Sequence, residues 1–141
     1  MLHLARRHGM RLAIENTKRH AEKLVRLVQS IAEKDLGFCL DTGHAFLGDD
    51  LEYCVSEMNE RLFIVHAQDT PGKESGDVHL PPFCGGIAWE SIAPRLGRQK
   101  PLWDFEVALL DRGGSAEDNL SETFRACAHA KTKLLKVTGA P

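Results

Sequence analysis

Four short apolar segments of this sequence each end in a residue that can bind a divalent metal ion. They span residues 11–15, 37–41, 62–66 and 102–106, and their last residues are Glu15, Asp41, His66 and Glu106. Each segment has the length and composition of a buried strand. Because the C-terminal ends of parallel strands converge on one rim of an α/β sheet, we expect the four side chains to meet there. The pattern predicts one divalent-metal site with three carboxylates and one imidazole.

Each of these four residues, taken alone, has an ordinary structural explanation. A carboxylate at a strand end can reach solvent or an ion-pair partner, and Asp41 can cap the helix that follows it. The joint pattern is harder to explain in this way, because carboxylates crowded on one rim repel each other unless a cation or protons hold them. We therefore favour the metal site.

Further polar residues stand close to these strand ends in the sequence. His44 follows Asp41 by three residues, at the expected mouth of the site. Asp77 and His79 lie in a long segment, residues 69–86, that is rich in glycine and proline. An Asp-x-His pair in a loop is by itself typical of a surface turn, but compact domains seldom keep such a long irregular loop without a use.

The elements that must position these residues alternate along the chain. The opening residues are typical of a helix end closed by Gly9, and helices are expected after the first strand, over residues 51–60 and 89–96, and from Ser115 onwards. Asn16 and Thr17 are candidate caps for the helix after the first strand, and Ser115 with Asp118 for the last helix. Repeated strand–helix alternation predicts an α/β fold with a parallel sheet and right-handed crossovers, in a single domain over residues 1–141.

The apolar residues of these helices recur at helical spacing and predict which faces are buried. In the helix after the first strand they are Leu24, Leu27, Val28 and Ile31. In the next helix they are Leu51, Cys54, Val55 and Met58. In the last helix they are Leu120, Phe124, Cys127 and Leu134.

Composition excludes several classes of function. The formal net charge of −2 over 141 residues argues against electrostatic binding to nucleic acid or to an anionic membrane. No segment approaches the ~20 apolar residues of a membrane-spanning helix, the opening residues lack the long apolar segment typical of a signal peptide, and no nucleotide-binding glycine motif follows the first strand. The four cysteines form no Cys-x-x-Cys pair, so we expect free thiols in the cytoplasm; they are Cys39, Cys54, Cys84 and Cys127.

Several of these segments together resemble the xylose isomerase-like TIM-barrel superfamily of sugar isomerases, epimerases and dehydratases, which also contains the endonuclease IV group. The matching segments are Ala13-Ile-Glu-Asn16, Leu40-Asp-Thr-Gly-His44, Val65-His-Ala-Gln-Asp69, Asp77-Val-His79 with the following Gly-Gly-Ile-x-Trp, and Phe105-Glu-Val107. They occur in the family's order and span nearly the whole chain. A complete barrel has eight strands and roughly 250 residues. The resemblance therefore implies the C-terminal half of a TIM barrel, with four strands and flanking helices.

The resemblance also implies a metal and an acid–base pair. The family's single-metal ligand set is matched by Glu15, Asp41, His66 and Glu106. A mixed carboxylate and imidazole set suits Mn²⁺, Mg²⁺, Co²⁺ or Zn²⁺. In the epimerase-like members the residues matching Glu15 and Glu106 also exchange protons with opposite faces of the substrate carbon.

Residues that would contact the substrate are implied in the same way. His44 matches a substrate-contacting histidine, and Asp77 and His79 belong to the same expected region. Relatives often carry a basic substrate-binding residue after the third of these strands, where Lys73 is the nearby candidate.

The expected function is therefore metal-dependent isomerisation or epimerisation of a sugar, a polyol or a keto-acid. One alternative is an endonuclease IV-like phosphodiesterase acting on abasic DNA, because Asp77 and His79 match ligands of that group's additional metals. The chain lacks the basic surface expected for DNA binding. Another alternative is a catalytically incomplete half-barrel that only binds metal. The open edges and uncovered inner face of a half-barrel predict a homodimer.

Overall fold

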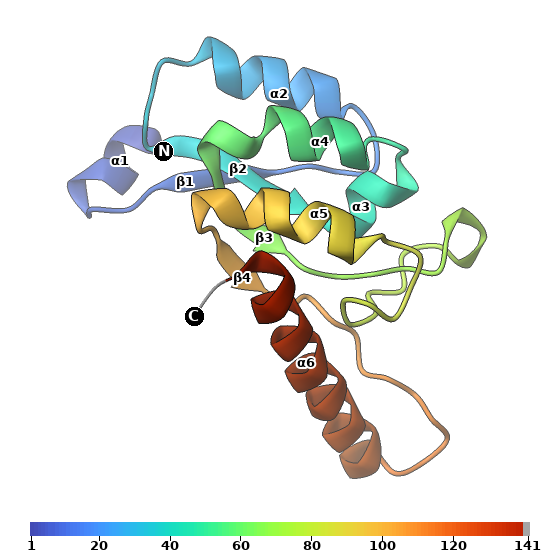
Figure 1. Cartoon of the computed structure of the whole chain (residues 1–141). Coiled ribbons are helices and arrows are strands. Elements are labelled where there is room, and N and C mark those ends of the chain that lie inside the picture. Colours follow the sequence, from blue (N-terminus) through green and yellow to red (C-terminus); the bar gives the residue numbers. More distant parts are fainter. Residues whose placement is uncertain (140–141) are drawn as a thin grey trace.

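A four-stranded parallel sheet forms the centre of the computed structural model, which describes residues 1–139 (Figure 1). The strands lie side by side in chain order as β1 (Leu12–Glu15), β2 (Leu36–Asp41), β3 (Leu62–His66) and β4 (Leu102–Asp104). All three strand pairs are parallel. This open sheet with flanking helices is an α/β half-barrel, and the predicted fold class is confirmed.

Helices α2, α4 and α5 lie over one face of the sheet (Figure 1). The helices are α1 (Leu2–Arg7), α2 (Ala21–Ser30), α3 (Thr42–Leu47), α4 (Leu51–Glu57), α5 (Trp89–Leu96) and α6 (Ala116–Thr138), with short 3₁₀ turns η1 (Asn59–Arg61), η2 (Lys73–Ser75) and η3 (Gly97–Gln99). Within residues 1–139 no helix is both long and apolar enough to span a membrane.

The core lies between the sheet and this helix layer. Phe38 and Leu40 of β2 are buried in it, together with Val65 of β3 and Trp89 of α5. Side chains alternate between the two faces of a strand, so Cys39 and the residue at the end of β2 point to the opposite, inner face. The face that carries the predicted ligands is thus distinct from the face that makes the core.

The start of α2 differs from the prediction. The N-cap is His20, in the left-handed region at φ 68°, and not Asn16 or Thr17. Asn16 instead ties β1 to β2: its Nδ2 donates to the Asp41 carbonyl oxygen at 3.0 Å, and its Oδ1 accepts from the Asp41 backbone N–H at 2.8 Å. A fully buried amide is better satisfied by these two backbone groups than by an exposed helix end.

Two other predicted helix boundaries are confirmed. At the end of α1, Gly9 has φ 65° and its N–H donates to the Arg6 carbonyl. At the start of α6, Ser115 and Asp118 form a reciprocal capping box. The connection after β2 contains two helices, α3 and α4, where a single helix over residues 51–60 was expected.

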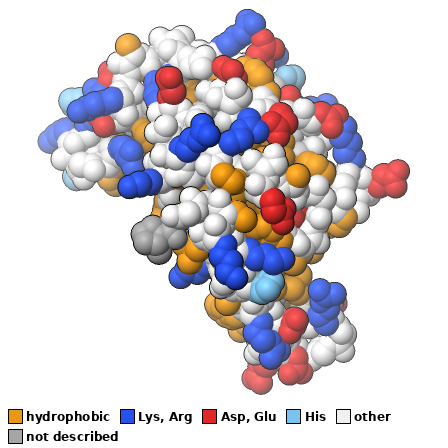
Figure 2. All heavy atoms as spheres, viewed as in Figure 1, with side chains coloured by type: hydrophobic (Ala, Val, Ile, Leu, Met, Phe, Trp, Pro, Cys, Tyr) orange, Lys and Arg blue, Asp and Glu red, His pale blue; other side chains and the backbone are white. Residues whose placement is uncertain are grey.

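Three residues expected in the core are exposed. Leu27 of α2 and Leu120 and Phe124 of α6 keep 53%, 49% and 68% of their surface accessible. In α6 the reason is visible in Figure 1, where its first turns project away from the sheet. Figure 2 shows hydrophobic side chains on this projecting part beside charged ones. These positions are amphipathic as predicted, but nothing within residues 1–139 covers them.

The long loop after β3 is held by the buried carboxylate of Asp69. Its Oδ1 accepts backbone N–H groups from Thr70 at 2.8 Å and Ile87 at 3.2 Å. Its Oδ2 accepts from the Gly85 N–H at 2.9 Å and from Trp89 Nε1 at 2.8 Å. Both ends of the loop are therefore fastened to one side chain, and the middle of the loop returns over the rim of the sheet.

Candidate functional site

The four residues predicted as metal ligands come together on the rim at the C-terminal ends of the strands. Each offers one ligand atom, and these atoms all lie within 4.8 Å of one another; the residues are Glu15, Asp41, His66 and Glu106. Strand register explains the proximity, because Asp41 of β2 pairs with His66 of β3. Strand β4 ends at Asp104, two residues short of the prediction, and Glu106 reaches the cluster from the segment that follows.

Three atoms of this rim cluster lack a hydrogen-bond partner among the described residues. They are Asp41 Oδ2, His66 Nδ1 and Glu106 Oε2, all shielded from solvent. His66 Nδ1 lies 2.8 Å from Glu106 Oε2 and 3.5 Å from Glu15 Oε2, but neither contact has hydrogen-bond geometry. Leaving a buried polar atom unpaired costs about 1–3 kcal/mol. A cation between them would satisfy all three, so the donor set fits a divalent metal ion.

Asp41 is the most constrained member of the rim cluster. Its side chain is fully buried, and its Oδ1 accepts from the His44 N–H at 2.7 Å and from Gln68 Nε2 at 3.0 Å. Burial raises the pKa of Asp41, against the lowering effect of the nearby His44. Asp41 therefore caps α3 with Oδ1, and its Oδ2 remains available to an ion.

The loop after β3 brings a second group of polar side chains to the same rim. His44, Asp77 and His79 offer ligand atoms that also lie within 4.8 Å of one another. Asp77 Oδ2 lies 3.0 Å from His44 Nε2, and Asp77 Oδ1 lies 3.2 Å from His79 Nε2. His79 has φ 50°, an uncommon backbone state for a residue other than glycine.

The charges within the loop cluster, which consists of His44, Asp77 and His79, stabilise one another. Burial alone would raise the pKa of Asp77, but hydrogen bonds from Lys18 and Gln68 and the charges of the two histidines outweigh it, and the pKa is lowered. Burial alone would lower the pKa of His44, but Asp41 and Asp77 outweigh it, and the pKa is raised. The arrangement favours an anionic Asp77 beside a protonated His44.

The two clusters form one continuous polar surface. His44 Nδ1 lies 3.5 Å from Glu15 Oε1, and His79 Nδ1 lies 3.8 Å from Glu106 Oε1. Gln68 Nε2 joins them by donating to both Asp41 and Asp77. Gly43 allows this approach, because a Cβ at that position would overlap the Gln68 amide. Three of the four residues predicted to contact substrate, His44, Asp77 and His79, thus lie directly beside the predicted metal ligands.

Lys73 is the predicted site residue that the structure does not bring to either cluster. Its Nζ pairs with Asp49 at the surface. The basic group beside the site is instead Lys18, whose Nζ lies 3.1 Å from Asp77 Oδ2. Sequence reasoning missed Lys18 and Gln68. Gln68 had a usable signal, because it follows His66 by two residues, whereas Lys18 stands in a connecting segment without a recognisable pattern.

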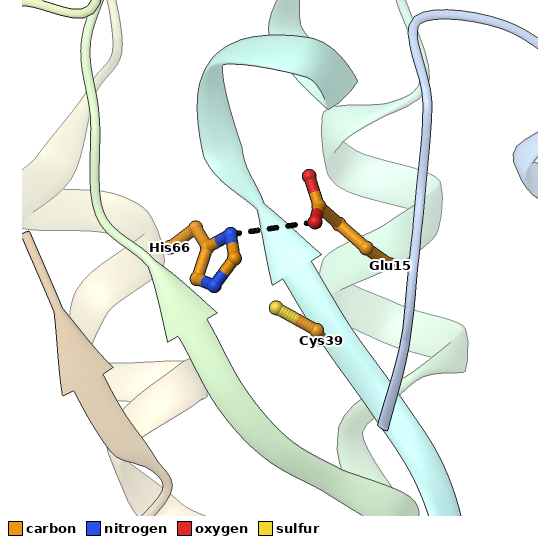
Figure 3. A group of neighbouring side chains, drawn as sticks. All are labelled: Glu15, Cys39 and His66. Atoms are coloured by element: carbon orange, nitrogen blue, oxygen red, sulfur yellow. Dashed lines mark ion pairs between the residues drawn. The ribbon is translucent and has the colours of Figure 1, made fainter. Parts of the chain in front are cut away.

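One further side chain, Cys39, reaches the rim cluster from below. Its Sγ lies within 4.8 Å of ligand atoms of Glu15 and His66, and Figure 3 shows it pointing into the space between them. Cys39 is paired in register with Glu15 and is only 4% exposed. Burial raises the pKa of its thiol to about 12, and the carboxylate of Glu15 acts in the same direction.

The members of the rim cluster differ in solvent exposure, and this difference indicates which roles each could have. The side chains of Glu15 and Glu106 are 40% and 43% exposed, whereas Asp41 is inaccessible. Asp41 is therefore suited only to holding an ion, and the two glutamates can also meet a molecule arriving from solvent. The chemistry available is metal binding with two carboxylates free to exchange protons.

Comparison with known proteins agrees with this fold. A solved structure described as a D-tagatose 3-epimerase-like protein superimposes with a TM-score of 0.72 at 20% sequence identity, over 98% of this chain and 51% of that one. At this identity the likeness establishes the fold, and the chain spans about half the length of the protein it matches. No curated protein sequence matches significantly. The family described as "Xylose isomerase-like TIM barrel" matches residues 1–128, and the chain therefore belongs to that family.

Proposed function

We propose that this chain acts as a metal-dependent isomerase or epimerase on a small hydroxylated carbonyl compound, such as a sugar or a keto-acid. One observation carries the proposal: four residues on one rim each offer a ligand atom within 4.8 Å of the others, and three of these residues carry a shielded polar atom that has no hydrogen-bond partner among the described residues. Membership of the xylose isomerase-like family and the fold of an epimerase-like protein support it.

The proposal assigns holding of the ion to Asp41 and His66, together with one oxygen each from Glu15 and Glu106. Asp41 Oδ2 is directed by the two hydrogen bonds that fix Oδ1. A divalent cation, when bound, would polarise a carbonyl or hydroxyl oxygen and so acidify the adjacent C–H group. Mn²⁺, Mg²⁺, Co²⁺ and Zn²⁺ are all compatible with this set.

Proton transfer falls to the two half-exposed glutamates. Glu15 comes from β1 at one edge of the sheet, and Glu106 follows β4 at the other. The carboxylate of one takes the proton from the carbon next to the carbonyl, and the carboxyl group of the other returns a proton to that carbon from the opposite side. His44 and Asp77, held 3.0 Å apart beside Glu15, would orient the substrate hydroxyl groups.

Metal binding is tested first, by elemental analysis of protein purified without chelators. We expect about one equivalent of divalent metal, as for a single site with protein ligands. Glu15→Gln and His66→Ala should lose it, and Glu90→Gln, a matched change at an exposed position of α5, should retain it. Absence of metal from the unmodified protein, even after incubation with Mn²⁺, would refute the proposal.

The reaction is tested by incorporation of deuterium from solvent into a panel of ketoses and keto-acids. Exchange that depends on both Glu15 and Glu106 is the expected result. The His44–Asp77–His79 cluster, a second set of metal-capable groups, favours an endonuclease IV-like activity as the second candidate. Cleavage of abasic DNA without carbon–deuterium exchange would favour that candidate. Bound metal with neither activity would indicate a half-barrel that binds metal without turnover.

A further inference from the structure

The thiol of Cys39 lies on the inner face of β2, outside the hydrophobic core cluster. Cys39 lies two residues before Asp41 on the same face of the strand, away from the helix layer. It is buried, but it does not belong to the hydrophobic core cluster that contains its neighbours Phe38 and Leu40. Its sulfur faces the ligand atoms of the rim cluster instead (Figure 3).

Two of the potential metal ligands in the rim cluster also form a group with Cys39. Glu15 and His66 belong both to the four-residue oxygen-rich group and to a group with Cys39, and within each group the ligand atoms lie within 4.8 Å of one another. Tetrahedral ligands at about 2.0–2.3 Å from one ion lie about 3.3–3.8 Å apart, so the side chains must move slightly closer together to close on a metal. Asp41 Oδ2 is shielded from solvent and has no hydrogen-bond partner among the described residues, which independently indicates that an ion belongs at this point.

The two groups differ in the metals that they favour. Mg²⁺ and Mn²⁺ prefer carboxylate oxygen, whereas Zn²⁺, Co²⁺ and Cd²⁺ accept thiolate sulfur together with imidazole and carboxylate. A set of one oxygen, one nitrogen and one sulfur leaves a position open in tetrahedral geometry, as catalytic zinc sites do. The choice between the groups therefore depends on the ion.

We propose that Glu15, Cys39 and His66 form a second, sulfur-containing binding mode of the rim site, used by thiophilic ions such as Zn²⁺, Co²⁺ and Cd²⁺. Mg²⁺ and Mn²⁺ take the oxygen-rich set with Asp41 and Glu106. As the metal–sulfur bond forms, the thiol proton passes to solvent, and no oxidation state changes. The inference rests on the metal site of the proposed function, and it adds a ligand and a selectivity to that site.

Spectroscopy of the Co²⁺ complex tests the proposal. All proteins compared carry Cys84→Ser, because Cys84 is an exposed thiol that could bind the probe. The reference protein should show a sulfur-to-cobalt charge-transfer band in the near ultraviolet, and Cys39→Ala should lack it. Cys54→Ala removes another buried thiol, on the core-facing side of α4, and should keep the band. A band missing from the reference protein, or surviving in Cys39→Ala, would overturn the proposal.

Metal selectivity provides a second measurement with the same proteins. In competition titrations Cys39→Ala should weaken Cd²⁺ binding by about tenfold or more and leave Mn²⁺ binding within about twofold, because only the thiophilic ion loses a preferred ligand. Equal weakening of the two ions would mean that Cys39 acts only by supporting the fold, and would contradict the proposal.

Zinc-edge X-ray absorption keeps the inference testable if Cys39→Ala does not fold. In the Cys84→Ser protein a sulfur shell at about 2.3 Å should accompany the nitrogen and oxygen shell at about 2.0–2.1 Å. A shell of nitrogen and oxygen alone would refute the sulfur-containing mode. Mn²⁺ binding without any metal–sulfur signal would overturn this inference alone, whereas binding of neither Mn²⁺ nor Co²⁺ would overturn the proposed metal site as well.

Discussion

The two carboxylate oxygens of Asp41 have different surroundings, although the side chain is short and fully buried. Oδ1 is held by the His44 N–H and by Gln68, so it both begins α3 and fixes the orientation of the carboxylate. Oδ2 has no hydrogen-bond partner among the described residues and faces His66 and Glu106. A ligand oriented in this way needs little reorganisation to bind an ion, and the same orientation makes the metal-free state costly.

Asp41→Asn should therefore have opposite effects on metal binding and on the stability of the metal-free protein. The amide can keep accepting at Oδ1, and its Nδ2 can donate to a carboxylate of the rim cluster such as Glu106. We expect loss of metal binding together with a metal-free protein that is more stable by about 1 kcal/mol, the scale of relieving a buried unpaired group. Thermal unfolding with and without added Mn²⁺ measures both effects.

Asp111→Asn, in an exposed loop, is the matched control and should change neither quantity. A metal-free Asp41→Asn protein that melts below the unmodified protein would contradict the stability prediction. It would mean that the Oδ1 contacts need a full negative charge.

Among the elements, the loop after β3 has the largest influence on the site. It carries Asp77 and His79. Its backbone is irregular except for the short 3₁₀ turn η2 and an isolated antiparallel bridge between Asp69 and Leu80. The Asp69 carboxylate accepts four N–H groups at the two ends of this loop, and Phe83 adds hydrophobic packing against the core. Asp69 thus helps to set the geometry of the loop cluster from outside it.

Asp69→Ala should release this loop. Four N–H donors would lose their acceptor, and we expect a loss of about 3 kcal/mol or more in the free energy of unfolding, because buried donors left unpaired cost about 1–3 kcal/mol each. Urea denaturation measures the loss. Limited proteolysis under native conditions should show new cleavage within residues 70–86.

Asp111→Ala is the matched control for this measurement, since Asp111 accepts the Gly113 N–H in an exposed loop. Its cost should stay near that of an ordinary surface substitution, within about 0.5 kcal/mol. Equal stability losses in the two variants, or an unchanged cleavage pattern in Asp69→Ala, would show that the loop is held by other contacts.

The whole molecule is an open half-barrel whose inner face and two edge strands are uncovered within residues 1–139. Leu102 of β4 lies on the inner face, two residues before Asp104, and remains 65% exposed. Arg11 at the β1 edge stacks on Phe63, with its guanidinium carbon 4.1 Å from the ring centroid. Unpaired parallel edges and exposed apolar residues favour association.

We expect two copies of the chain to associate through these surfaces, since together they supply the eight strands that a closed barrel requires. Sedimentation equilibrium at micromolar concentration should show a homodimer. Leu102→Asp should shift it toward monomer by placing a charge on the inner face, and Leu120→Asp, on the projecting part of α6, should not. A stable monomer of the unmodified protein would rule out this arrangement.

Much of the fold and of the site follows from local pattern. The strands and the meeting of Glu15, Asp41 and His66 follow from apolar runs with a polar residue at the end, because parallel strands bring equivalent ends to one rim. Two of the errors have a common physical cause, which is competition from residues distant in sequence. Asn16 pairs with the backbone of β2 rather than capping α2, and Lys73 pairs with Asp49 rather than approaching the site.

The sequence by itself determined the class of fold and the chemical character of the rim, because both depend on short-range periodicity and on residue type. Only the tertiary structure decided which atoms lack partners, that Lys18 rather than Lys73 lies beside Asp77, and that Cys39 faces the ligands. These facts depend on strand register and on how one loop folds back over the rim. They arise from contacts between segments far apart in the chain, which no local pattern encodes.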